Sequence, residues 1–540
     1  MKRRDFLRRT AFGASALLIV KTASGSTTKT GTPPAAPNDR KSFALEEMSV
    51  ADLQRGMASG RFTAAALVQH FLKRIAEVDR KGPRLNSVIE SNPDAIGIAE
   101  ALDRERKAKG PRGPLHGIPI LIKDNIDTHD RMTTTAGSLA LEGSIPPRDS
   151  FLAERLRAAG AVILGKTNLS EWANFRGSRS ISGWSGRGGQ TRNPYCIDRS
   201  PSGSSSGSAS AVSANLCAVS IGTETNGSIV SPASYCGVVG LKPTVGLVSR
   251  TGIIPIAASQ DTAGPFGRTV GDAAVLLGVM TGVDSRDAAT ESSAGKAHAD
   301  YTQFLDTGAM RGARIGVARE LFKLHRLVDP VLESALEAIR RAGAVLIDPV
   351  KLPPRQDLGG ADYQVMLFEF KAGLNAYFAS LGANAPVKSM QELIEFNDRN
   401  RERELPFFGQ ETLIEAQAKG PLTDQGYVDA KERCLKWSQS IDAVIDEHQL
   451  DAVVAPTGGP AHTLDLVVGD RGLGGSSTYA AVAGYPNITV PCGDVFGLPV
   501  AISFFGRPWS EAKLIGIAHA FEQATKARKP PRFLPTMELA

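Results

Sequence analysis

The sequence predicts an α/β protein, because short apolar segments typical of buried strands alternate along it with segments typical of helices. Thr63 can cap a helix in which apolar residues recur every four positions. Residues 116–125, "HGIPILIKDN", have the apolar run of a buried strand and end in polar side chains. A helix that begins at Asp149 or Ser150 ends at Gly160, and the strand "AVILG" follows at once.

The first 42 residues differ from the rest of the chain. The twin-arginine pattern "KRRDFLR" is followed by an apolar run that ends at Val20 and is too short for a membrane anchor. We therefore predict a twin-arginine signal peptide at residues 1–25, a disordered Pro-rich tether at residues 26–42 and one domain at residues 43–540. A protein with this signal is expected in the periplasm or outside the cell.

Charge and composition exclude several classes of partner. The chain has a formal net charge of +6, and residues 1–25 contain six basic side chains and one acidic side chain. The remainder is close to neutral, so neither a nucleic acid nor a membrane surface is expected as a partner. No later apolar run is long enough to anchor the mature chain in a membrane. The five cysteines lack the paired spacing of a metal site, and their odd number leaves at least one thiol unpaired.

A serine-rich run, "SPSGSSSGSAS" at residues 200–210, has the composition of a flexible linker. Its surroundings contradict that interpretation. The small apolar residues from Ala209 to Leu216 are typical of a tightly packed helix, and "CAVSIGTE" at residues 217–224 is typical of a buried strand. We therefore expect the run to lie in the core, where Gly203 and Gly207 permit sharp turns and close approach of the backbone.

Lys123 is the candidate base for a serine nucleophile in this region, because no histidine lies between His129 and His298. A lysine with its ordinary pKa of about 10.4 is charged at neutral pH and cannot accept a proton. Burial would have to lower that pKa to roughly 7 to 8. The alternative is a lysine at a strand end whose amine reaches solvent.

Six segments of the chain form a specific combination: "GIPILIKDN", "GKTNLSEWA", "GSSSGSASAVSANL", "GTETNGSIVSPASYCGVVGLKPTVGLVS", "QDTAGPFGRTVGDAA" and "GYPNITVPCG". Together they resemble the amidase signature family, and the resemblance covers the chain from about Leu45 onward. It implies a single-domain amidase signature fold, in which helices cover both faces of a large mixed β-sheet, and it implies serine-dependent hydrolysis of carboxamide C–N bonds.

The resemblance also implies a Ser-Ser-Lys triad. Lys123 corresponds to the catalytic lysine of the family and Ser228 to its nucleophile. The bridging serine of the family follows a cis peptide bond and lies 24 residues before the nucleophile, which selects Ser204. Ser204 would relay a proton between Ser228 and Lys123, and the reaction would pass through an acyl-enzyme without a metal or a cofactor.

The remaining site residues are carried over in the same way. The backbone N–H groups of Thr225, Asn226, Gly227 and Ser228 are expected to form the oxyanion hole. Ser205, Asp124 and Asn125 are expected to support the relay or to orient the lysine. A turn at Ser205 and a strand-end cap at Asp124 and Asn125 explain these residues nearly as well.

Two departures from the family pattern bear on the substrate. Asn226 stands where many members have glycine, and Val230 stands where many have an arginine that can bind a substrate carboxylate. A small dicarboxylate half-amide is therefore disfavoured. "NGSIVSPAS", "VGLVSRTGIIP" and "FEFKAGLNAYF" are most similar to peptide amidases, which release ammonia from C-terminal peptide amides. The alternatives are an exported amidase for small aryl or aliphatic amides and a protein that binds amides or peptides without cleaving them.

Other expectations concern the pocket and the partners. Residues 361–423 are expected to line the acyl pocket, whereas the aromatic residues Phe368, Phe370, Tyr377 and Phe378 are expected in the core. The glutamyl-tRNA amidotransferase members of the family require a protein partner and tRNA, and the export signal argues against that role. No amphipathic membrane-binding helix of the kind found in fatty-acid amide hydrolases is evident. The expected partner is a small amide or a peptide amide, bound by a monomer or a homodimer.

Overall fold

The computed structural model describes residues 43–383 and 385–539, so the signal peptide and tether predicted for residues 1–42 lie outside the described residues. Internal contacts divide the chain into one unit at residues 1–44 and another at residues 45–540. Every helix and strand named below belongs to the second unit. Within the described ranges, no helix has both the length and the apolar character needed to cross a membrane.

The second unit is built on a mixed 11-stranded sheet with the strand order β1-β3-β2-β6-β8-β7-β12-β13-β11-β9-β10. β3, β2 and β6 are parallel neighbours, as are β10, β9 and β11, and antiparallel pairs connect the two groups. The strands of this sheet are β1 (Val88–Ser91), β2 (Pro119–Lys123), β3 (Val162–Thr167), β6 (Val219–Glu224), β7 (Val239–Lys242), β8 (Thr262–Gly267), β9 (Arg314–Val317), β10 (Val345–Ile347), β11 (Ala452–Pro456), β12 (Asn487–Val495) and β13 (Leu498–Phe505). β4 (Trp184–Ser185) and β5 (Gly189–Gln190) form a separate small sheet.

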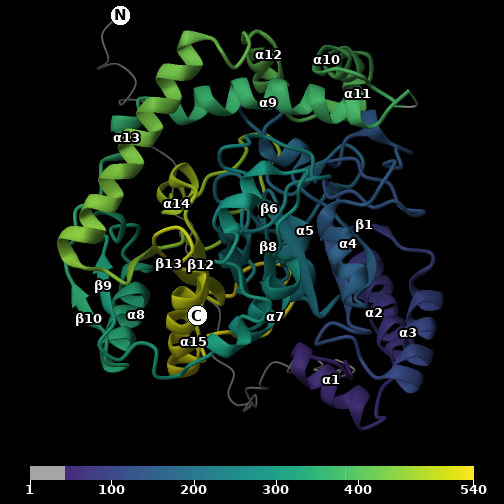
Figure 1. Ribbon diagram of the computed structural model, residues 1–540, viewed down its shortest axis with the longest axis horizontal. Coiled ribbons are helices and arrows are strands. Elements are labelled where there is room, and N and C mark those ends of the chain that lie inside the picture. The colour runs from purple at the N-terminus through teal and green to yellow at the C-terminus, as the bar shows by residue number, and fades with distance from the viewer. Residues whose placement is uncertain (1–42, 384, 540) are drawn as a thin grey trace, which may run out of the picture. The chain divides into compact units, whose positions relative to one another are not determined.

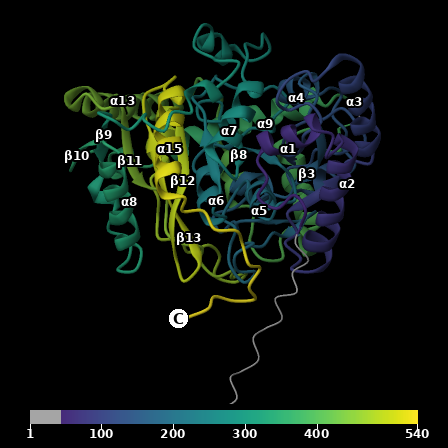
Figure 2. The same cartoon turned by 90° about the horizontal axis from the view of Figure 1, so that it is seen from below.

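Helices cover both faces of the large sheet. Figure 2 shows α7 and α15 on one side of the central strands and α5 and α6 on the other. In Figure 1, α9 and α13 pack against each other at the periphery of the second unit. The α-helices are α1 (Val50–Ala58), α2 (Ala64–Arg74), α3 (Ala95–Lys109), α4 (Phe151–Ala158), α5 (Ser206–Ser213), α6 (Val230–Tyr235), α7 (Val270–Met280), α8 (Asp329–Arg341), α9 (Ala361–Ser380), α10 (Met390–Arg399), α11 (Arg401–Glu404), α12 (Glu411–Gln417), α13 (Gln425–His448), α14 (Ser477–Ala483) and α15 (Glu511–Thr525).

The local signals in the sequence are confirmed. The Thr63 hydroxyl accepts a hydrogen bond from the N–H of Ala66 and so caps α2, and Ser150 caps α4 in the same way. The serine-rich run enters α5, whose residues are all buried, and β6 follows as predicted. The run is therefore part of the core and not a linker.

The carboxyl ends of β2 and β6 lie side by side, because these neighbouring strands are parallel and pair Ile122 with Ile221. Lys123 is the last residue of β2 and Glu224 is the last residue of β6. Ligand sites in sheets of this kind lie beyond the carboxyl ends of the strands. The fold therefore brings the candidate base to the same edge as the loop that contains Ser228.

Candidate active site

The amine of Lys123 is completely buried and lies among hydroxyl groups. Its Nζ donates to Ser204 Oγ at 2.8 Å, to Thr223 Oγ1 at 2.8 Å and to the Thr223 carbonyl oxygen at 3.4 Å. Burial lowers the lysine pKa to about 7, although the carboxylates of Asp261 and Glu224 act in the opposite direction. The alternative in which this amine reaches solvent is therefore wrong, and a large fraction of the amine is neutral near pH 7.

The segment at Ser204 is fastened to two neighbouring parts of the chain. The peptide bond between Gly203 and Ser204 is cis, and a Cβ at position 203 would lie 2.2 Å from Ser170 Oγ. Ser205 donates from Oγ to the Thr223 carbonyl at 3.0 Å and accepts from the Thr223 N–H at 3.2 Å. The Ser205 N–H donates to the carbonyl oxygen of Ser228 at 3.2 Å. Ser205 thus holds the Ser204 segment against both β6 and Ser228.

Ser228 lies in a short loop, residues 225–228, which we call the oxyanion loop. A carboxylate oxygen of Glu224 accepts from the N–H groups of Ile229 at 2.7 Å and Val230 at 3.1 Å, directly after this loop. Gly227 has a φ of +84°, and a Cβ there would lie 2.9 Å from Ser477 Oγ. Within residues 43–383 and 385–539, the four N–H groups of the loop make no hydrogen bond to a protein acceptor. They are therefore available to a ligand.

Asn226 links the oxyanion loop to α14. Its side-chain oxygen accepts from Ser477 Oγ at 2.8 Å, and its Nδ2 donates to Thr478 Oγ1 at 3.3 Å. Asparagine replaces the glycine of many family members at this position, and these two bonds anchor the loop to the helix. The sequence marked Asn226 as a departure but held no signal for its partners.

Asp124 is held by groups other than Lys123. Its carboxylate accepts from Thr135 Oγ1 and from the N–H of Gly137, and it lies 3.6 Å from Arg187. Burial raises its pKa, although Lys166 and Arg187 act in the opposite direction.

Asn125 is connected to the lysine through the hydroxyl of Thr223. Asn125 Nδ2 donates to Thr223 Oγ1 at 3.1 Å, and that oxygen also accepts from Lys123. Thr223 was missed by the sequence analysis. Its position at the end of β6, just before the oxyanion loop, is the signal that could have identified it.

A cavity of about 460 Å³ opens beside these groups. Asn125, Thr223, Thr225 and Asp261 line it at the end nearest Lys123. Its wall is largely apolar and is formed by Ala173, Ile253, Ile254, Pro255, Ile256, Ala258, Gly373 and Ala376. Three arginines also line it, Arg148, Arg250 and Arg286. Arg250 is paired with Asp287 at 2.5 Å and Arg286 with Glu154 at 2.8 Å.

The helix α9 contributes to this cavity, as expected of residues 361–423. Phe368, Phe370 and Phe378 lie in the core as predicted. Tyr377 is also buried, but it lines the cavity as well, and its hydroxyl donates to Asp127 Oδ1 at 2.9 Å. The prediction that this tyrosine belongs only to the core is therefore corrected.

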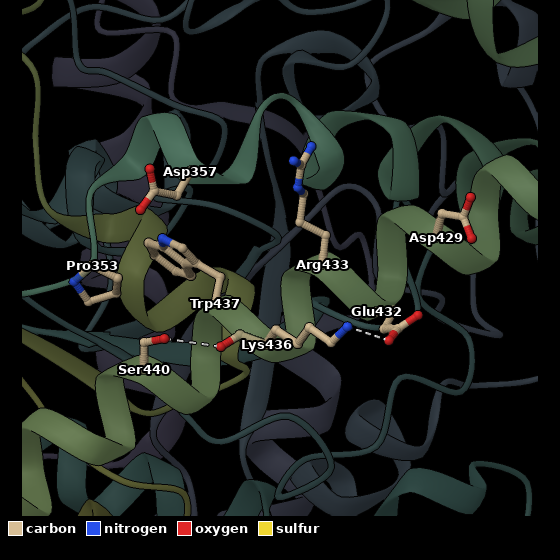
Figure 3. Close-up of a pocket in the computed structure, with 8 residues that line it drawn as sticks. All are labelled: Pro353, Asp357, Asp429, Glu432, Arg433, Lys436, Trp437 and Ser440. Carbon is tan, nitrogen blue, oxygen red and sulfur yellow. Dashed lines mark hydrogen bonds and ion pairs between the residues drawn. The ribbon is translucent and has the colours of Figure 1, made fainter.

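A second hollow, of about 420 Å³, lies on the surface of α13 (Figure 3). Its lining residues come from α13 and from residues 353–357, and Trp437 lies at its base, where its indole N–H donates to the Pro354 carbonyl at 3.0 Å. None of the residues that surround Lys123 lines it. This hollow is therefore separate from the site around Lys123.

Comparison with known proteins identifies the family. Residues 66–515 match the family model described as Amidase. The chain belongs to the amidase family. It is therefore an amide-hydrolysing enzyme with the amidase signature fold, and the alternative of a protein that only binds amides is not supported.

Solved structures of peptide amidases are strongly similar to this amidase. The native peptide amidase of Stenotrophomonas maltophilia is 54% identical with a TM-score of 0.87, over 91% of this chain and 100% of the other. A peptide amidase in complex with the competitive inhibitor chymostatin is also 54% identical, with a TM-score of 0.88 over the same shares of the two chains.

Curated relatives carry more varied descriptions. A probable amidase of Arabidopsis thaliana is 42% identical over 91% of this chain and 93% of its own length. A component of the glutamyl-tRNA(Gln) amidotransferase of Rippkaea orientalis is 35% identical over 89% of this chain and 99% of its own length.

Proposed function

We propose that this amidase hydrolyses the C-terminal amide of peptides and releases ammonia, with Ser228 as nucleophile, Ser204 as proton relay and Lys123 as base. The observation that supports the triad most directly is the 2.8 Å hydrogen bond between the buried Lys123 amine and Ser204 Oγ. The bond from the Ser205 N–H to the Ser228 carbonyl also supports the triad, because it joins the neighbour of Ser204 to Ser228.

The proposed reaction begins with a proton transfer. Ser228 gives its hydroxyl proton to Ser204 as Ser204 gives its own to the neutral amine of Lys123, and Ser228 Oγ attacks the amide carbon. The negative charge that develops on the carbonyl oxygen is stabilised by N–H groups of the oxyanion loop, which bind the tetrahedral state more strongly than the planar amide. The same relay returns a proton to the leaving nitrogen, and ammonia departs. Water then hydrolyses the acyl-enzyme by the same route.

The shape and polarity of the cavity support a peptide as the acyl group. A volume of about 460 Å³ lies within the range of pockets that enclose ligands larger than a simple aliphatic amide. The wall suits an apolar side chain, and Val230 follows the nucleophile where an arginine would favour a substrate carboxylate. The similarity to peptide amidases favours the same substrate class.

The proposal includes the cellular location of the enzyme. The twin-arginine pattern at the start of the sequence supports export to the periplasm or the outside of the cell. The glutamyl-tRNA amidotransferase relatives fit this pattern poorly, because export would separate the enzyme from tRNA.

The test is ammonia release from a C-terminally amidated dipeptide, with the free-carboxylate dipeptide as the blank. Ser228→Ala is compared with Ser234→Ala, a nearby buried serine of α6 whose hydroxyl has no partner among the described residues. We expect release by the wild type and by Ser234→Ala and none by Ser228→Ala. Release by Ser228→Ala would overturn the nucleophile assignment. Cleavage of aryl or aliphatic amides alone would favour the alternative substrate.

A further inference from the structure

Asp261 connects two parts of the site that are distant in the sequence. It immediately precedes β8 and lines the cavity. One carboxylate oxygen, Oδ1, accepts from Thr225 Oγ1 at 2.5 Å. The other, Oδ2, accepts from the N–H groups of Ile256 at 2.8 Å and Ala257 at 2.9 Å. Thr225 begins the oxyanion loop, whereas Ile256 belongs to the apolar cavity wall.

We propose that Asp261 is a positioning residue for the acylation step, which joins the oxyanion loop to the wall that contacts the acyl group. This inference rests on the proposed function. A substrate side chain that fills the cavity contacts the wall at Ile256. The hydrogen bonds of the Asp261 carboxylate couple the position of Ile256 to that of Thr225. An acyl group that fits the wall therefore favours the loop arrangement in which the N–H groups meet the carbonyl oxygen.

The chemistry of the contacts suits a carboxylate. All three partners of Asp261 are hydrogen-bond donors, and an ionised carboxylate accepts at both oxygens. An asparagine can accept both backbone N–H bonds at its one oxygen, and its NH₂ group can donate to the Thr225 hydroxyl, which is able to turn and accept. Asp261→Asn therefore keeps the size of the side chain and removes its charge, whereas Asp261→Ala removes the hydrogen bonds on both sides and breaks the connection.

The charge of Asp261 gives a second, separate readout. The charged groups that act on Lys123 are Asp261 and Glu224, and both carboxylates raise the lysine pKa against the effect of burial. Arg250 lies close enough to Asp261 to lower the pKa of its carboxyl, while burial is the larger effect and raises that pKa to about 6. Removing the Asp261 charge therefore lowers the lysine pKa.

The test compares two amides that differ only in how far they fill the cavity, N-acetyl-leucinamide and N-acetyl-glycinamide. Turnover by the wild type establishes that such amides are substrates, independently of the inference. For Asp261→Ala we expect kcat for the leucine compound to fall on the order of tenfold or more, because oxyanion donors are individually worth at least that much. The loss for the glycine compound should be clearly smaller.

Two further variants distinguish the loss of the hydrogen bond between Asp261 and Thr225 from a general loss of folded structure. Thr225→Val removes the hydroxyl that Asp261 holds, and Thr225→Ser retains it. We expect Thr225→Val to show the same loss of leucine preference in kcat and Thr225→Ser to keep that preference. The acidic limb of the kcat/KM profile should move to lower pH in Asp261→Asn and Asp261→Ala and stay in place in the Thr225 variants. Equal fractional losses for the two amides in Asp261→Ala and Thr225→Val would overturn the inference.

Discussion

Two lysines at the ends of neighbouring strands have the same burial and different surroundings. Lys123 ends β2, and Lys166 is paired with Ile122 on the adjacent strand β3. Both amines are completely buried, and burial lowers both pKa values. The amine of Lys123 donates to the hydroxyls of Ser204 and Thr223, with two carboxylates acting from further away.

The amine of Lys166 is bonded to neutral groups and has carboxylates near it. Its Nζ donates to the Ile126 carbonyl at 2.7 Å and to Thr134 Oγ1 at 2.8 Å, and the nearby carboxylates of Asp124 and Asp127 favour its charged form. A carbonyl can accept a hydrogen bond but has no proton to give. The Thr134 hydroxyl in turn donates to the Ile126 carbonyl at 3.4 Å, whereas the Ser204 segment contacts Ser228. The comparison teaches that burial alone does not make a lysine a base; its hydroxyl partner must also lie next to the group that reacts.

Replacing Lys123 is expected to have the largest effect. Lys123→Met keeps a long apolar stem but has no amine to accept the proton from Ser204. General acid–base groups contribute about 10²- to 10⁴-fold, so we expect kcat to fall by at least that order. The measurement is single-turnover ammonia release with folded protein. Full activity in this variant would remove the distinction between the two lysines.

Lys166→Met is expected to act on stability instead. It leaves the carboxylates of Asp124 and Asp127 buried without the cation that Lys166 supplies. Breaking a buried ionic interaction from one side costs about 3–5 kcal/mol. Chemical denaturation should show this loss in the free energy of unfolding, whereas Lys123→Met should show a much smaller one. A stability equal to that of the wild type would contradict the ionic role of Lys166.

The pH profile of the wild-type enzyme tests the state of Lys123. Its pKa is lowered to about 7, and only the neutral amine accepts a proton. Activity is therefore present above this pH and lost as the pH falls, and kcat/KM should decrease about tenfold for each unit below the pKa. Steady-state rates from pH 5 to pH 9 measure this acidic limb of the kcat/KM profile. A flat profile across this range would mean that the lysine is not the titrating base.

Thr223 is expected to give the smallest of these effects. Thr223→Val removes the hydroxyl that accepts from both Lys123 and Asn125, so the amine loses one of the groups that orient it toward Ser204. We expect a kcat reduction of about tenfold, in line with the loss of a buried hydrogen bond to a charged or polar group. Thr223→Ser is the control that retains the oxygen. The contact is unimportant if the two variants have equal kcat values.

Much of the fold and of the candidate site could be predicted from the sequence. The caps at Thr63 and Ser150, the buried strand that ends at Lys123 and the helix after the serine-rich run depend on neighbours within a few residues. Ser204 and Ser228 were selected by the resemblance to the amidase signature family, and the structure brings their segments together.

The remaining contacts depend on how distant strands are placed. Lys123 and Thr223 meet because β2 and β6 are parallel neighbours, although the residues are 100 positions apart. Asp261 reaches Thr225 over 36 positions and Asn226 reaches Ser477 over 251, and Tyr377 lies at a boundary between core and cavity. The sequence by itself determined which groups are chemically able to act and which segments are buried, because those properties follow from local pattern and composition. Only the tertiary structure decided which carboxylate accepts from Thr225 and which lysine donates to Ser204, because side-chain contacts between strands follow from strand order and register.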